Sequence, residues 1–140
     1  MNSTINSSNP TSAAISKGAL WTGRVMSTLV VLFLLMDGVM KLFKPEVVVK
    51  GTVELGYPET VIIPLGVVLL ISVVLYLIPR TAVLGAILVT GYFGGAIAAH
   101  VRVGNPLFSH VLFPVYFGVL LWGGLYLRDV RIRALIPFRK

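Results

Sequence analysis

The chain has 140 residues, of which 56% are hydrophobic and only 12% charged, and its mean hydropathy is +0.92. A soluble domain carries about a quarter charged residues, so this composition indicates an integral membrane protein with a formal net charge of +7. The lack of cysteine excludes a disulfide, a CxxC redox pair, an iron–sulfur cluster and a thiol nucleophile supplied by this chain.

The N-terminal segment is polar and precedes a long apolar run. Residues 1–16 are rich in Ser, Asn and Thr and carry no charged side chain, so we expect a disordered tail over residues 1–18. The following run resembles a signal peptide at its start, but it has no small-residue cleavage site and continues to Phe43. We therefore interpret this run as a retained membrane helix.

Four apolar segments each approach the about 20 residues that span a bilayer core, namely 20–43, 61–78, 81–99 and 111–127. The corners at Ile78–Arg80 and Val103–Pro106 are short, so the helices on either side of each must be antiparallel. The sequence thus predicts an all-α fold, an antiparallel up-down bundle of four transmembrane helices within residues 19–128. The connection 44–60 should form an ordered loop or partial helix over one end, and residues 129–140 a basic C-terminal tail.

The basic residues are distributed unevenly between the two ends of the predicted bundle. Four spans put both termini on one side, and eight of the twelve Lys and Arg lie there with only one acid, Asp129. The positive-inside rule then predicts cytoplasmic termini and a plasma or inner membrane location. Because topology and attraction to anionic lipid explain the basic excess, we predict no nucleic-acid partner.

Asp37 is the candidate at the centre of a polar site. An ionisable group at bilayer depth costs about 2.5–3.5 kcal/mol at a helix centre, and such residues are usually functional. Lys41 follows one turn later on the same face and can pair with Asp37. The predicted topology gathers further polar groups at the same outer end, so the candidate cluster is Asp37, Lys41, Glu54, Tyr92, His100, Arg102 and His110.

The third predicted helix carries small residues at four-residue spacing: Gly91, Gly95 and Ala99. This pattern is typical of close helix packing in membranes. We expect most of this face to pack within the bundle, with a dimer seam as the alternative. A partner helix packed there and carrying Asp37 could accept hydrogen bonds from His100 or Arg102.

Structural explanations stand beside the functional ones. The Asp37–Lys41 pair could simply fix helix register, and Arg102 could be a snorkelling anchor. Haem is disfavoured because a short hairpin cannot hold two imidazoles on opposite faces of a porphyrin. Zinc on His100, His110 and Asp37 is chemically acceptable but also disfavoured, so no metal site is assigned. No hydrolase, zincin or nucleotide-binding motif is present, and no catalytic residue is assigned.

Several segments together resemble a known family. Met36–Phe43, Leu55–Pro58, Gly91–Ala96 and the run His100–Gly104 are similar to those of the DoxX-like four-helix membrane proteins, over about residues 20–128. The wider family takes its name from a membrane subunit of a thiosulfate:quinone oxidoreductase. Other relatives look like partners of redox enzymes, and an animal relative assists assembly of neuronal acetylcholine receptors. The resemblance implies the fold and the site, and no particular reaction.

Three functions remain open. The sequence favours an accessory or assembly factor for a membrane partner, not an enzyme by itself, because nothing in the chain carries electrons unaided. The second is a quinone- or lipid-binding subunit, in which a quinone carbonyl would be bonded by Arg102, His100 or Lys41. Asp37 would then relay a proton, and Tyr92 or Phe93 would flank the ring. The third is a small proton-coupled transporter acting as a homodimer. No cofactor is indicated firmly; quinone is the candidate.

An apolar cleft between the first and third helices, open to lipid near Asp37, would favour the ligand-binding function. A closed and satisfied polar cluster would favour the accessory function.

Overall fold

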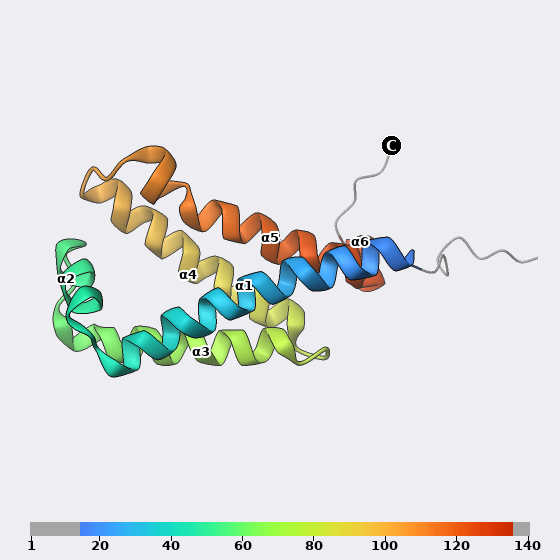
Figure 1. Ribbon diagram of the computed structural model, residues 1–140, viewed down its shortest axis with the longest axis horizontal. Coiled ribbons are helices and arrows are strands. Elements are labelled where there is room, and N and C mark those ends of the chain that lie inside the picture. Colours follow the sequence, from blue (N-terminus) through green and yellow to red (C-terminus); the bar gives the residue numbers. More distant parts are fainter. Residues whose placement is uncertain (1–14, 136–140) are drawn as a thin grey trace, which may run out of the picture.

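Helices form the regular secondary structure of residues 15–135, the part of the chain that the computed structural model describes. Four of these described helices belong to segments long and apolar enough to cross a membrane. They are α1 (Lys17–Phe43), α3 (Ile62–Leu77), α4 (Ala82–Arg102) and α5 (Phe113–Arg128). In Figure 1 the chain runs along the long axis in α1, returns in α3, and repeats this course in α4 and α5. The predicted all-α fold of four membrane helices is confirmed.

Helix α1 begins and ends at residues that satisfy its terminal backbone groups. The Ser16 hydroxyl accepts a hydrogen bond from the first turn at 3.2 Å. At the other end Lys44 is left-handed with φ 52°, and Pro45 cannot continue the helix. The helix starts at Lys17, so its first two residues fall within the N-terminal tail predicted over residues 1–18. Residues 1–14 of that predicted tail lie outside the described residues.

The connections at the outer end are themselves helical. Helix α2 (Glu46–Glu54) lies across this end of the bundle (Figure 1), as the expectation of a partial helix anticipated. A 3-10 turn (Glu59–Val61) leads into α3, and a π-helical turn (Leu107–Val111) precedes α5. Helix α5 starts two residues later than predicted, with Pro114 in its first turn, where the missing N–H costs no hydrogen bond.

The chain continues beyond α5 as a short packed helix, α6 (Val130–Leu135). Ile132 is 1% exposed, and the Asp129 carboxylate accepts a hydrogen bond from the Arg131 N–H at 2.9 Å. The structure therefore differs from the prediction of a C-terminal tail over residues 129–140. The first residues of that segment form a helix that packs against the bundle, because the apolar side chain of Ile132 is buried in the core. Residues 136–140 lie outside the described part of the chain.

The core lies along the middle of the bundle, where α1 packs against α3 and α5, and α3 packs against α4. Its fully buried side chains are mostly aliphatic: Val30, Leu34, Leu69, Val73, Val89, Leu121 and Leu125. Many of the large apolar side chains outside this core are exposed, as expected for helices that face lipid. Towards the outer end the α4–α5 pair diverges from α1 and α3 in Figure 1, and α2 occupies that end.

Close approaches between helices occur at glycines, but not at those predicted. A Cβ on Gly23 would lie 2.8 Å from the Gly124 carbonyl oxygen, and one on Gly66 would lie 3.0 Å from the Gly38 carbonyl oxygen. A Cβ on Gly85 would overlap the backbone of α3. These contacts join α1 to α5, α1 to α3, and α4 to α3.

The small-residue face of α4, formed by Gly91, Gly95 and Ala99, does not pack closely within the bundle as predicted. A Cβ on Gly91 or Gly95 would meet nothing within 4 Å, so neither glycine packs closely against another helix of this chain. Only Ala99 of the three is buried, at 5% exposure. The expected packing face is open because the outer half of α4 leans away from α1 (Figure 1).

Tyr76 links three helices through its buried hydroxyl group. The hydroxyl donates to the Leu121 carbonyl of α5 at 3.0 Å and lies 2.9 Å from the Ser27 hydroxyl of α1. Tyr76 is 1% exposed and Ser27 is 7% exposed. The Ser27 hydroxyl also accepts a hydrogen bond from Arg128 Nε at 3.1 Å. Because buried polar groups need such partners in an apolar environment, the network fixes how α1, α3 and α5 meet.

Tyr76→Phe should therefore lower the free energy of unfolding by about 1 kcal/mol, because two hydrogen bonds are lost while the ring packing is kept. The measurement is SDS-induced unfolding of the purified protein. Tyr116→Phe is the control, since Tyr116 is 48% exposed and its hydroxyl makes only a 3.4 Å hydrogen bond. Equal losses in the two variants would contradict a special role for the Tyr76 hydroxyl.

Candidate functional site

A cavity of about 550 Å³ lies at the outer end, bounded by α1, α2, α4 and the start of α5. Its wall is mainly apolar and aromatic, with Phe33, Leu34, Phe93, Ala96, Phe113 and Phe117 among the lining residues. Polar groups reach the same space: Asp37, Lys41, Thr52, Tyr57, Tyr92 and His100. A volume of this size and a mostly apolar lining with a few polar groups are typical of small-molecule sites.

Asp37 and Lys41 form an ion pair on the cavity wall. The Lys41 Nζ and Asp37 Oδ2 atoms are 2.6 Å apart, as their spacing of one helical turn predicts. The Lys41 side chain is 12% exposed and that of Asp37 is 32% exposed. Lys41 Nζ also lies 5.9 Å from the centroid of the Tyr92 ring, so the ammonium bridges α1 and α4.

Arg102 does not reach this pair. Its guanidinium donates to the Leu55 carbonyl at 2.6 Å and thereby ties the end of α4 to the loop after α2. The guanidinium also occupies the place where a Cβ of Gly56 would be, and Gly56 has φ +90°. Glycine is required there both for the backbone angle and for the close approach. Asp37 accepts a hydrogen bond from Lys41, as its spacing predicted, and the further hydrogen bonds from His100 or Arg102 that a packed α4 would have allowed are not formed.

The two histidines lie side by side at the outer end. Their ring centroids are 5.6 Å apart in an edge-to-face arrangement. The Asn105 amide lies 2.8 Å from His100 Nδ1, so in the neutral ring Nδ1 accepts and Nε2 carries the proton. His100 lines the cavity, whereas His110 is exposed and lies 2.7 Å from the Ser109 hydroxyl through its Nδ1. In residues 15–135 no group of three His, Cys, Asp or Glu residues is suited to holding a metal.

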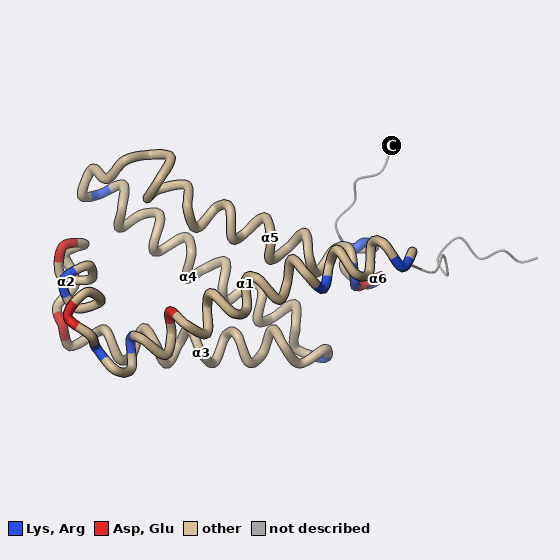
Figure 2. The backbone as a smooth tube through the Cα atoms, in the orientation of Figure 1, with Lys and Arg blue, Asp and Glu red and all other residues tan. Residues whose placement is uncertain are grey.

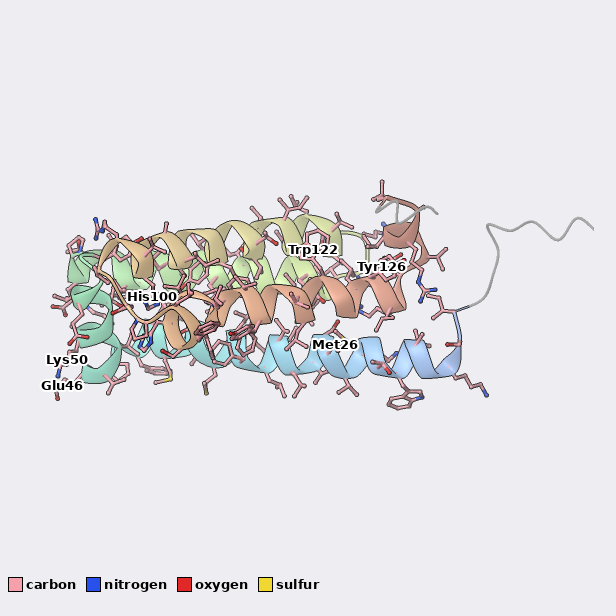
Figure 3. All side chains as sticks on the ribbon, turned by 90° about the horizontal axis from the view of Figure 1, so that it is seen from above. Met26, Glu46, Lys50, His100, Trp122 and Tyr126 are labelled. Atoms are coloured by element: carbon pink, nitrogen blue, oxygen red, sulfur yellow. The ribbon has the colours of Figure 1, made fainter. Side chains whose placement is uncertain are left out.

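The predicted cluster is thus divided. Asp37, Lys41, Tyr92 and His100 share the cavity wall, while Glu54, Arg102 and His110 lie outside it. Figure 3 shows His100 near the α2 end of the bundle and Glu46 and Lys50 at the outer edge of α2, away from the helices. The small residues Gly91, Gly95 and Ala99 also line the cavity rather than forming a packed seam.

Sequence reasoning missed an aromatic group on this wall. Phe33 stacks on Phe117 with centroids 4.2 Å apart, and Phe113 meets both rings, at 5.5 Å from Phe33 and 4.9 Å from Phe117. A signal was present, because Phe33 precedes Asp37 by one turn and Phe113 precedes Phe117 by one turn. The part played by α2, which supplies Val47, Val48, Gly51 and Thr52, had no such signal.

Comparison with known proteins gave one result. The family model for DoxX-like proteins matches residues 25–124, well over half of the chain, and confirms the resemblance inferred from the motifs. No curated protein and no solved structure matched the chain. With its four membrane helices and this match, the chain belongs to the DoxX-like family.

Proposed function

We propose that this protein binds a small amphipathic molecule of the quinone class in its outer cavity and acts as a ligand-binding subunit in the membrane. The observation that carries the proposal is the cavity itself, about 550 Å³ with apolar and aromatic walls and an ion pair on one side. A quinone head group has a flat ring, two carbonyl oxygens and an apolar tail. Each of these features has a counterpart in the cavity.

Hydrogen-bond donors on the wall suit a carbonyl oxygen. The Lys41 ammonium, the Tyr92 hydroxyl and His100 Nε2 all belong to lining residues. A donor in a largely apolar site binds an oxygen more strongly than it would in water. Arg102, the other predicted donor, is engaged with Leu55 and serves instead to hold the α2 end of the cavity.

Aromatic side chains suit the ring of the ligand. Phe33, Phe113 and Phe117 form one contiguous group, and Tyr92 lines the cavity on α4. Aromatic pairs gain about 0.5–1.5 kcal/mol beyond the burial of their surface. The Asp37–Lys41 pair beside these rings provides an acid–base pair for a proton that accompanies quinone reduction.

The accessory function fits this geometry less well. It needs only a closed polar cluster, whereas the groups around Asp37 border an open apolar cavity. The sequence favoured the accessory function because the chain carries no redox centre of its own; a subunit that binds the quinone for a redox partner is consistent with that argument.

The orientation in the membrane is also a proposal. Figure 2 shows Lys and Arg at both ends of the bundle, whereas most of the acidic residues lie at the α2 end. The end where α1 begins and α6 lies therefore carries the excess of positive charge. This asymmetry supports cytoplasmic termini, and we place the protein in the plasma or inner membrane as part of the same proposal. The cavity would then lie in the outer half of the bilayer.

The proposal is tested by filling the cavity. Gly95→Phe should weaken binding of decylubiquinone at least about tenfold, because the new ring enters a space that now holds no other atom within 4 Å. Binding is measured by titration calorimetry in matched detergent, and molecules that co-purify with the wild type are identified by mass spectrometry.

The matched control is Gly94→Phe. Gly94 is the neighbouring residue, a Cβ there also meets nothing within 4 Å, and it does not line the cavity. This variant should bind the probe as the wild type does. Equal affinity in Gly95→Phe, or an equal loss in both variants, would contradict a ligand in this cavity. A wild-type protein that binds no probe and carries no small molecule would favour the accessory function over ligand binding.

A further inference from the structure

A second cavity lies at the opposite end of the bundle, where α1 begins (Figure 1). It has a volume of about 280 Å³, and α1, α3 and α5 form its wall. It shares no lining residue with the outer cavity. Two arginines line it, Arg24 from α1 and Arg128 from α5, so its chemistry is that of an anion site.

The direction of the hydrogen bonds fixes how Arg128 is held. Arg128 can only donate, so its Nε–H donates to the Ser27 hydroxyl oxygen at 3.1 Å. Tyr76 donates to the Leu121 carbonyl, which leaves its oxygen to accept from Ser27. The guanidinium also lies 5.3 Å from the centroid of the Tyr76 ring. Arg128 is thus anchored by one edge through a buried network.

The other edge of the Arg128 guanidinium is free. Its two terminal nitrogens make no hydrogen bond to any residue within 15–135. Two parallel N–H groups of arginine match the geometry of a phosphate. Arg24 is exposed, and its described contact is with the Trp21 ring at 5.9 Å. Neither arginine takes part in an ion pair with a described residue.

No acidic side chain competes for these two cations. Four of the five Asp and Glu residues lie toward the opposite, outer end of the bundle. The fifth, Asp129, pairs with Arg131. Two cations near the end of a membrane helix therefore lack a counter-ion within the described protein. The two cations are therefore available to bind an anion from outside the chain.

An apolar surface continues from the cavity along the membrane helices. Leu32 of α1 and Leu77 of α3 line the cavity and are 60% and 54% exposed, and Val31, which also lines it, is buried. A soluble anion gains nothing from this surface, but the acyl chain of a lipid does. The cavity is also too small for a whole lipid and suits a head group.

From these observations we propose that the inner cavity binds the phosphate head group of an anionic phospholipid, with Arg24 and Arg128 as ligands and the acyl chains lying along α1 and α3. This site is independent of the proposed quinone site. Lipid binding at this site would anchor the bundle to the leaflet that is predicted to face the cytoplasm, where anionic lipid is enriched.

The test is native mass spectrometry of the full chain in detergent, titrated with phosphatidylglycerol. Arg128→Gln and Arg24→Gln should each weaken binding of the first phosphatidylglycerol molecule about fivefold. Arg80→Gln is the matched control, because Arg80 is an exposed cation at the same end that does not line the cavity. Circular dichroism checks the fold, and Arg24→Gln keeps the test decisive if Arg128→Gln does not fold.

Each outcome bears on the proposal. Loss in both cavity variants with no loss in Arg80→Gln supports it. An equal loss in all three variants would mean diffuse charge attraction, and unchanged binding in Arg24→Gln would remove Arg24 as a ligand; either overturns it. Equal affinity for phosphatidylcholine would overturn the need for an anionic head group. Displacement of the lipid by millimolar inorganic phosphate would assign the cavity to a soluble anion instead.

Discussion

Gly85→Ala should lower the free energy of unfolding by about 3 kcal/mol, a large loss for the addition of one methyl group. The new Cβ would overlap the backbone of Tyr76 in α3, and backbone atoms cannot swing aside as the end of a flexible side chain can. Helix α4 would have to move away from α3. That movement would also disturb the Tyr76 hydroxyl network that joins α3 to α1 and α5.

The measurement is the midpoint and slope of SDS-induced unfolding, with thermal denaturation in detergent as a second readout. Gly94→Ala is the control in the same helix, because a Cβ on Gly94 meets nothing within 4 Å. Alanine favours a helix over glycine by at most about 1 kcal/mol, so this control should be neutral or slightly more stable. If both variants lose stability equally, the close approach of α4 to α3 at Gly85 is wrong.

Asp37→Leu should also cost about 3 kcal/mol, because it leaves the ammonium of Lys41 without its carboxylate partner in an apolar wall. Lys41 is 12% exposed, so water reaches it poorly. Breaking a buried pair costs about 3–5 kcal/mol, and the lower end applies here because Asp37 is 32% exposed. Unfolding in SDS measures the loss.

The double variant Asp37→Leu/Lys41→Leu separates structure from function. It contains no unpaired charge, so it should recover most of the stability lost in the single variant. It should nevertheless bind decylubiquinone more weakly than the wild type, because the polar side of the cavity is gone. Full recovery of both stability and binding would show that the ion pair has only a structural role, which two leucine side chains can fulfil.

Asp37→Asn is the milder companion of that experiment. The amide oxygen still accepts a hydrogen bond from Lys41, so the stability loss should be smaller than for leucine. The substitution removes the charge needed for a proton relay. The activity coupled to the bound ligand should therefore lose a larger fraction of its wild-type value than the free energy of unfolding does. A variant that keeps both would contradict any special role for Asp37.

The features determined by the sequence alone are local in the chain. Apolar runs of sufficient length predicted the four membrane helices. The first of them has Ser16 as its N-cap and Lys44 as its C-cap, followed by Pro45. The Asp37–Lys41 pair follows from a spacing of one helical turn on a single helix. Such features need no knowledge of which helix lies beside which, so they could be predicted.

Whether the small residues of α4 pack against another helix or line a cavity depended on the tertiary structure. A stripe such as Gly91 and Gly95 permits close packing but does not require it, and the same absence of side chains can leave room for a ligand. The outcome depends on the angle between α4 and α1, which contacts elsewhere fix, including the one between Gly85 and α3. The sequence therefore indicated a packed seam where the fold has a cavity wall.

The two proposed sites depend on contacts between residues distant in sequence. Arg102 reaches Leu55 across 47 positions, and Arg128 reaches Ser27 across 101. Helical periodicity specifies neighbours three or four residues apart and says nothing about partners on other helices. The sequence by itself determined the membrane helices and the ion pair within one of them. Only the packing of four helices at their particular angles decided which polar groups share a cavity, because that geometry is a property of all the interhelical contacts together.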